Sequence, residues 1–198
     1  MADPWALLPA LAAGIALAAT AGLRAFLPLF AVGLAGRLGW IHLGSSFGWL
    51  ESTPALVAFG SAVVLELLGD KFPAVDHALD AIGVVVKPIA GTLVFTAVLG
   101  DMDPWLRTTI GIVGGATVAG GTHLVKAKTR IGSSLLTMGI ANPVLSFAED
   151  ALALTTATLA VLWPAVALVL VVLAAAGLYA TFRLARGTFR AARRAVEI

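Results

Sequence analysis

Six of the eleven acidic residues lie in two short stretches at the ends of apolar segments. The stretch "ELLGDKFPAVDHALD" (66–80) holds Glu66, Asp70, Asp76 and Asp80, and "NPVLSFAED" ends in Glu149 and Asp150. A spacing of four residues places Glu66 and Asp70 on one face of a helix, and the second pair repeats it. Like charges this close repel one another. Cations, protons or basic side chains must therefore compensate them.

Three kinds of compensation fit these residues, and the sequence leaves them open. Basic side chains could pair with the acids in a structural network, and they are Arg24, Lys71, Lys126, Lys128 and Arg130. His123 is a further candidate site residue at the same membrane level. Alternatively, Glu66 and Asp70 could bind a transported cation or a proton. In the third hypothesis Asp70, Asp76 and Asp80 hold a divalent cation in an enzyme that acts on a lipid phosphate.

Composition predicts the environment of these charges. The 198-residue chain is 60% hydrophobic and 12% charged, whereas an average globular domain has about 45–50% apolar and about 25% charged residues. Such a chain has too little polar surface for a soluble fold, so we expect an integral membrane protein. The chain contains no cysteine, which excludes disulfides and thiolate chemistry.

Helical spans are predicted because a crossing needs about 20 predominantly apolar residues. Six windows qualify, at 5–36, 53–69, 83–100, 105–125, 144–163 and 165–187. The sequence therefore predicts an all-α, polytopic transmembrane bundle with about six crossings. We expect a transmembrane domain over 1–187 and a basic cytoplasmic tail over 188–198.

The first window is too long for one span. As a single helix it would measure about 48 Å, against a hydrocarbon core of about 30 Å. Gly22, Arg24 and Pro28 lie together in "TAGLRAFLPLF". We therefore predict a broken first helix with Arg24 facing protein or water. If 5–36 instead makes two crossings or a re-entrant pair, the N-terminus changes sides.

A weaker pattern suggests two inverted groups of three helices, each led by a helix that is interrupted after small residues. The interruptions would fall at "TAGLR" and "VAGGTH". Residues 131–142 are apolar but too short to span, which predicts a re-entrant half-helix ending at Asn142-Pro143. Ser146 and Glu149 have the spacing of a capping box at the start of the next helix.

The basic residues predict orientation and partners. Lys71, Lys87, Lys126, Lys128 and Arg130 fall on one predicted side, together with the tail arginines, which are Arg183, Arg186, Arg190, Arg193 and Arg194. The positive-inside rule makes this side cytoplasmic, with both termini on it. A basic tail beside a span is typical of contact with anionic lipid rather than nucleic acid.

Four stretches resemble a family of small bacterial multi-pass inner-membrane proteins catalogued as a domain of unknown function. They are "AGLRAFLPLF", "ELLGDKFPAVDHALD", "GGTHLVKAKTR" and "NPVLSFAED", within a resemblance that covers about residues 10–165. It implies an all-helical inner-membrane protein and supplies no activity, cofactor or catalytic residue.

The leading functional hypothesis is therefore a small transporter or permease, not an enzyme, that binds an ion or anionic solute at the charged cluster. A chain of 198 residues can enclose little of a translocation pathway on its own, so we expect a homo-oligomer. A divalent cation is the only cofactor that the acids suggest. The alternatives are the metal-dependent lipid-phosphate enzyme and a non-catalytic membrane scaffold.

Overall fold

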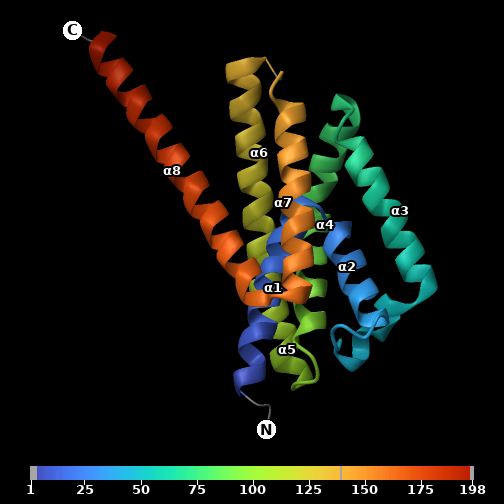
Figure 1. Ribbon diagram of the computed structural model, residues 1–198. Coiled ribbons are helices and arrows are strands. Elements are labelled where there is room, and N and C mark those ends of the chain that lie inside the picture. Colours follow the sequence, from blue (N-terminus) through green and yellow to red (C-terminus); the bar gives the residue numbers. More distant parts are fainter. Residues whose placement is uncertain (1–3, 139, 197–198) are drawn as a thin grey trace.

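The structure is a computed structural model that describes residues 4–138 and 140–196. Side chains are not described for residues 4–6, 73–74, 76–77, 136, 181–182 and 184–196. Within the described ranges all regular structure is helical (Figure 1). The elements are α1 (Pro4–Leu23), α2 (Phe26–Arg37), η1 (Ser45–Glu51, a 3-10 helix), α3 (Thr53–Gly69), α4 (Pro73–Val98), α5 (Pro104–Ile110), η2 (Gly111–Ala116, a π-helix), α6 (Thr117–Thr137), α7 (Asn142–Leu162) and α8 (Pro164–Val196).

The first apolar segment breaks where the sequence predicts, between Leu23 and Phe26. The two pieces form a hairpin, because α2 runs back toward the end at which α1 begins (Figure 1). Pro9 and Ala10 near the start of α1 line the same small cavity as Trp40 and Ile41, which follow α2. Of the two arrangements that the sequence left open for residues 5–36, the structure has the one that folds back. The termini therefore do not share a side, because α1 begins at one end of the bundle and α8 finishes at the other (Figure 1).

Small residues allow α1 to lie at the centre of the bundle. It packs against α4, α6, α7 and α8, and Ala16, Leu17, Ala18 and Ala21 are each 0% exposed. A helix with alanines on several faces lets neighbouring backbones approach closely, as is typical of helices packed inside membranes. The core thus fixes α1, and with it Arg24 at its C-terminal end.

Glycines bring α4 against the π-helical turn η2. A Cβ on Gly115 would lie 2.5 Å from the carbonyl oxygen of Gly91, and one on Gly111 would lie 1.8 Å from Thr96 Oγ1. Glycine at these two positions therefore allows the close packing of α4 on η2. The predicted interruption at "VAGGTH" is wrong, because α6 is continuous there and the irregular turn is η2. The inverted repeat thus loses one of its two supports.

The prediction of a re-entrant half-helix at 131–142 is also wrong. Residues 131–137 are the last turns of α6, which ends where Met138 adopts a left-handed conformation with φ of 54°. Asn142 and Pro143 begin α7 rather than end the preceding segment. Lys87, Lys126, Lys128 and Arg130, which were expected on the cytoplasmic side, lie inside α4 and α6.

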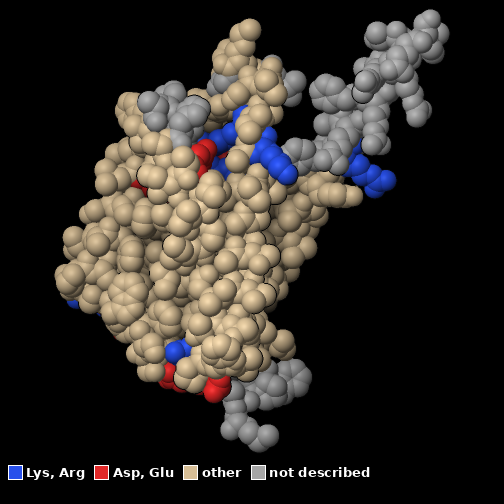
Figure 2. Space-filling view, turned by 180° about the vertical axis from the view of Figure 1, so that it is seen from behind, with Lys and Arg blue, Asp and Glu red and all other residues tan. Residues whose placement is uncertain are grey.

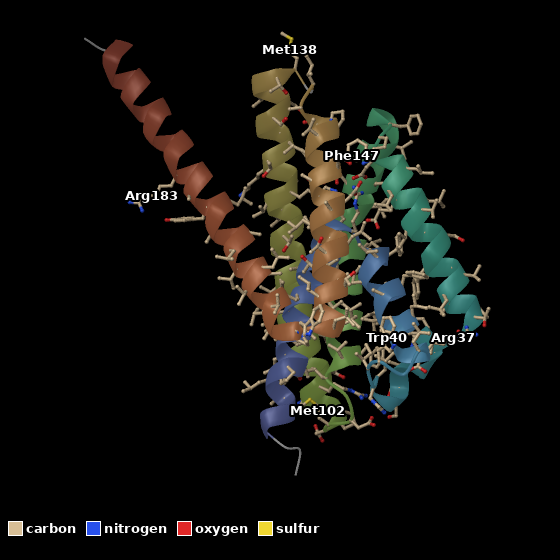
Figure 3. All side chains as sticks on the ribbon, viewed as in Figure 1. Arg37, Trp40, Met102, Met138, Phe147 and Arg183 are labelled. Atoms are coloured by element: carbon tan, nitrogen blue, oxygen red, sulfur yellow. The ribbon has the colours of Figure 1, made fainter. Side chains whose placement is uncertain are left out.

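The bundle has helices that suit a membrane, although six crossings are not confirmed. In the described chain Ala78–Val98 and Asn142–Leu162 are long and apolar enough to cross, and the bent pair Ser45–Glu51 and Thr53–Gly69 is a third candidate. Figure 2 shows Lys, Arg, Asp and Glu gathered near the two ends of the molecule, with a broad uncharged band between them. Figure 3 places Met138 and Phe147 toward one end, and Trp40, Arg37 and Met102 toward the other.

A smaller polar contact closes the end of the bundle near Met102. Asp101 accepts a hydrogen bond from the backbone N–H of Ser45 (2.9 Å). Arg107 donates to the carbonyl of Gly100 (3.1 Å) and to Ser46 Oγ (3.2 Å). The hydrogen bonds from Ser45, followed by the charge of Arg107, lower the pKa of Asp101 below its ordinary value of 3.8.

This contact predicts a pH-dependent order of the η1 loop. A lowered pKa means that the contact stabilises the loop above pH of about 4 and is lost as pH falls through the pKa of the folded state. We expect Asp101→Ala to speed amide exchange of residues 41–51 at pH 7, with the difference vanishing at pH below that pKa. Asp103→Ala is the matched control, since the Asp103 side chain accepts a hydrogen bond from the N–H of Leu106 and so caps α5 instead of the η1 loop. Equal exchange of the loop in wild type and Asp101→Ala at pH 7 would contradict the assignment.

Candidate functional site

Arg24 is the centre of a buried network of charges at the turn of the α1–α2 hairpin. The residue is 1% exposed. One of its terminal nitrogens pairs with Asp70, which follows α3, and the other with Asp150 of α7. The second nitrogen also lies 3.4 Å from Ser146 Oγ. The prediction that Arg24 faces protein or water is confirmed, because it faces protein.

Glu66 accepts hydrogen bonds from backbone N–H groups at the break between α1 and α2. A helix that begins inside a protein leaves N–H groups without partners in its first turn. The Glu66 carboxylate accepts from the N–H of Ala25 (2.8 Å) and of Phe26 (3.3 Å), so it caps the start of α2. A carboxylate is also favoured at the positive end of a helix dipole. The geometry therefore gives Glu66 a structural role at the hairpin.

Two cations of α6 bind the acids from the opposite side. Lys126 Nζ lies 3.4 Å from Asp70 and 3.3 Å from Glu149. Arg130 lies one turn further along α6, and its guanidinium is 3.0 Å from Asp70 and 2.9 Å from Glu149. Asp70 is thus bound by Arg24, Lys126 and Arg130, with its side chain 2% exposed. These contacts join the ends of α1 and α3 to α6 and α7.

Lys71 completes the network on its more open side. Its Nζ is 2.8 Å from Asp150 and 2.7 Å from Ser146 Oγ, and it lies 4.1 Å above the ring of Phe147. The predicted capping box is therefore wrong. Ser146 lies in the second turn of α7, where it is 1% exposed, and it serves as a partner for Arg24 and Lys71.

A second pair of basic side chains lies beside the network. Lys87 Nζ of α4 is 3.1 Å from His123 Nδ1 of α6 and 3.9 Å from Asp80. Asp80 also lies 4.0 Å from Lys126, which connects this pair to the rest. Lys87 and His123 are 4% and 3% exposed. A lysine that donates to His123 Nδ1 requires an imidazole whose Nδ1 carries no proton.

The structure brings most of the predicted site residues together. The two acidic stretches meet at one end, as do the cations that the sequence suggested, and these residues are Arg24, Glu66, Asp70, Lys71, Asp80, His123, Lys126, Arg130, Glu149 and Asp150. The side chains of Asp76 and His77 lie outside the described residues. Sequence reasoning did not include Lys87 or Ser146 in the site. Lys87 could have been found, because it interrupts the apolar run "AIGVVVKPIAG".

Of the three aspartates in the alternative metal hypothesis, Asp70 and Asp80 are described, and both lie against cationic side chains. Among the described residues no group of three His, Asp or Glu side chains is arranged to hold a metal. Asp70 is surrounded by three cationic groups, which would repel a divalent ion. Since the Asp76 side chain is not described, the three-aspartate hypothesis stays a prediction.

The fold and the network together define an all-helical protein with membrane-type helices and a buried charge network at the turn of a helical hairpin. The chain belongs to a family described as a domain of unknown function (DUF4126), whose model matches residues 11–183. The resemblance seen in the four sequence stretches is thereby confirmed, and the match extends into α8. No curated protein and no solved structure matches the chain.

Proposed function

We propose that the protein is a small membrane permease that binds an anionic solute at the charge network around Arg24. The observation that carries the proposal is the turn of the α1–α2 hairpin, which lies within the bundle. Arg24 contacts Asp150, eight residues into α7, and lies beside Lys126, eleven residues before the end of α6. At 1.5 Å per residue these contacts lie about 12–17 Å inside the ends of the two helices.

Interrupted helices whose break is lined by ionisable groups buried in the bundle are typical of transport sites. An unsatisfied backbone there is tolerated only where protein or a cavity surrounds it. In this chain Glu66 satisfies the backbone of the break, and Arg24 is held by acids that come from two other helices. Several residues from other helices therefore stabilise the break between α1 and α2. This is expected of a break that has a function, and not of one that only shortens an overlong helix.

The geometry favours an anion over a cation as the solute. Glu66 is engaged with backbone N–H groups, and Asp70 is engaged with three cations. An anion could take the place of the Glu149 carboxylate at Lys126 and Arg130, because both groups offer the same acceptor oxygens. Arg24 Nε also supports this choice, since it is buried without a hydrogen-bond partner among the described residues.

The distribution of basic residues supports a proposed orientation and location. The network end contains most of the lysines and arginines, whereas the other end contains Arg37 and Arg107. By the positive-inside rule we assign the network end and the C-terminus to the cytoplasm of a bacterial inner membrane, with the N-terminus on the opposite side. We also retain a homo-oligomer and contact of the basic tail with anionic lipid as proposals.

Flux through liposomes tests the permease. We expect wild-type protein to move at least one of chloride, phosphate and succinate above the leak of empty liposomes. Arg130→Gln and Lys126→Gln should reduce that flux at least tenfold, because each removes a cation that the solute would contact. Lys128→Gln is the matched control, since Lys128 is an exposed residue of the same helix.

Comparable size-exclusion profiles of all variants would show that a loss of flux is not a loss of folding. Unchanged flux in both Arg130→Gln and Lys126→Gln would contradict the proposed site. Absence of flux for all three anions, with stable monodisperse protein, would favour the scaffold. That second candidate draws support from the extensive pairing of the network, because buried ion pairs also serve only to organise a fold.

A further inference from the structure

The C-terminal helix leaves a groove along the bundle. Figure 1 shows α8 diverging from α6 and α7 toward the C-terminus. The groove has a volume of about 790 Å³ and is lined by α1, α6, α7 and α8. Ligand pockets commonly measure about 300–1,000 Å³. Its walls are mainly apolar, with Ala19, Val118, Val125, Leu152, Val171 and Leu178 among them.

The groove has one polar end, which adjoins the charge network. Lys126, Thr129 and Glu149 line it there. On α6 the lining extends from Thr117 to Thr129, which corresponds to about 18 Å at 1.5 Å per residue. This length is close to the depth of one leaflet, about half of the 30 Å hydrocarbon core. A polar end joined to an apolar channel of this length suits an amphiphile.

The charge of the flanking helices indicates an anionic head group. In sequence α6 contains Lys126, Lys128 and Arg130 and no acid, and α8 contains five arginines and no acid. Glu149, the acid that lines the groove, is already bound by Lys126 and Arg130. Arg183 extends from α8 on the side away from the bundle (Figure 3). We therefore place the head group at Lys126 and not at Arg183.

We propose that this groove binds an anionic lipid from the surrounding bilayer, with its acyl chain between α6, α7 and α8 and its head group at Lys126. This inference rests on the proposed function, because it narrows the anionic solute of the permease to a lipid-like anion. Binding itself can be measured without transport. A lipid would enter sideways from the bilayer, since α8 forms one wall of the groove and diverges from α6 and α7 (Figure 1).

Glycines provide variants that fill the groove without disturbing the packing. Gly121 of α6 and Gly177 of α8 line the groove, and a Cβ at either position meets nothing within 4 Å. Gly121→Phe and Gly177→Phe should therefore place a ring in the space that the acyl chain would occupy. Gly132→Phe is the matched control, because Gly132 has equal space on α6 but does not line the groove.

The probe is cis-parinaric acid, a fluorescent single-chain carboxylate, titrated into purified protein in a neutral detergent. We expect saturable binding that Gly121→Phe and Gly177→Phe each weaken at least tenfold, while Gly132→Phe stays within twofold of wild type. Lys126→Gln should weaken binding of the acid at least fivefold. Parinaryl alcohol, which lacks the charge, should bind wild type no better than it binds Lys126→Gln.

Three results would overturn the inference. They are absence of saturable parinarate binding, equal binding by Gly121→Phe and wild type, and equal affinity of wild type for the acid and the alcohol. A change of oligomeric state in Gly121→Phe without parinarate binding would assign the groove to a second copy instead. Parinarate binding as expected without anion flux would remove the permease and keep the lipid site. Flux of small anions, together with parinarate binding that Gly121→Phe leaves unchanged, would remove the lipid site and keep the permease.

Discussion

Arg24→Met is expected to destabilise the protein more than any other single change in the charge network. The substitution keeps the length of the side chain but leaves Asp70 and Asp150 as buried acids without their shared cation. Removing one partner of a buried ion pair commonly costs about 3–5 kcal/mol. We expect a sharply lowered midpoint of thermal unfolding in detergent, or loss of monodisperse protein.

Two further variants separate charge from packing. Arg24→Lys keeps the charge but not the planar group that reaches two acids at once, so its midpoint should lie between those of wild type and Arg24→Met. Adding Asp150→Asn to Arg24→Met removes the charge of an acid that has lost Arg24 but still contacts Lys71, and should recover part of the loss. If Arg24→Met unfolds at the temperature of wild type, Arg24 does not hold the hairpin turn and the network is wrongly assigned.

Gly115→Leu is the second change with a large expected effect. A Cβ at this position would lie 2.5 Å from the carbonyl oxygen of Gly91 and 2.7 Å from its carbon. Both atoms belong to backbone, so α4 and η2 would have to separate. Overpacking of this kind costs about 1–3 kcal/mol and sometimes more. We expect Gly115→Leu to unfold at a lower temperature than wild type.

Gly121→Leu is the matched control for this substitution, since a Cβ there meets nothing within 4 Å. Its thermal midpoint should stay close to that of wild type. Equal midpoints for Gly115→Leu and Gly121→Leu would contradict the close approach of α4 to η2. The comparison measures packing alone, because neither position contacts the charge network.

Local chemistry explains what could be predicted from the sequence. Gly22, Arg24 and Pro28 predicted the break after α1, because each disfavours a continuous apolar helix. Pro54 and Pro104 lie in the first turns of α3 and α5, and Pro164 begins α8, as suits a residue that has no N–H to leave unpaired.

Tertiary packing explains what could not be predicted. A broken helix of 32 residues can continue across a membrane or fold back, and only the docking of α2 on α3 and α7 decides between them. The pattern "IGSSLLTMGIAN" looked like a separate half-helix because it is apolar and ends in Asn-Pro, yet its first seven residues belong to α6. Ser146 resembled a cap because its side chain suits one, but the helix begins a turn earlier at Asn142.

The α1–α2 hairpin brings Arg24 into the network and places the N-terminus opposite the C-terminus. The chain lacks native cysteines, so single introduced cysteines can report the side on which a residue lies. The measurement is labelling with a membrane-impermeant maleimide in oriented vesicles, with one cysteine at Trp40, at Met138 or directly before Met1. Trp40 and Met138 are 61% and 94% exposed. We predict that the cysteine before Met1 is labelled from the same side as Trp40→Cys and from the side opposite to Met138→Cys. Labelling of that cysteine from the Met138 side would show that the first segment crosses without folding back, and would contradict the account.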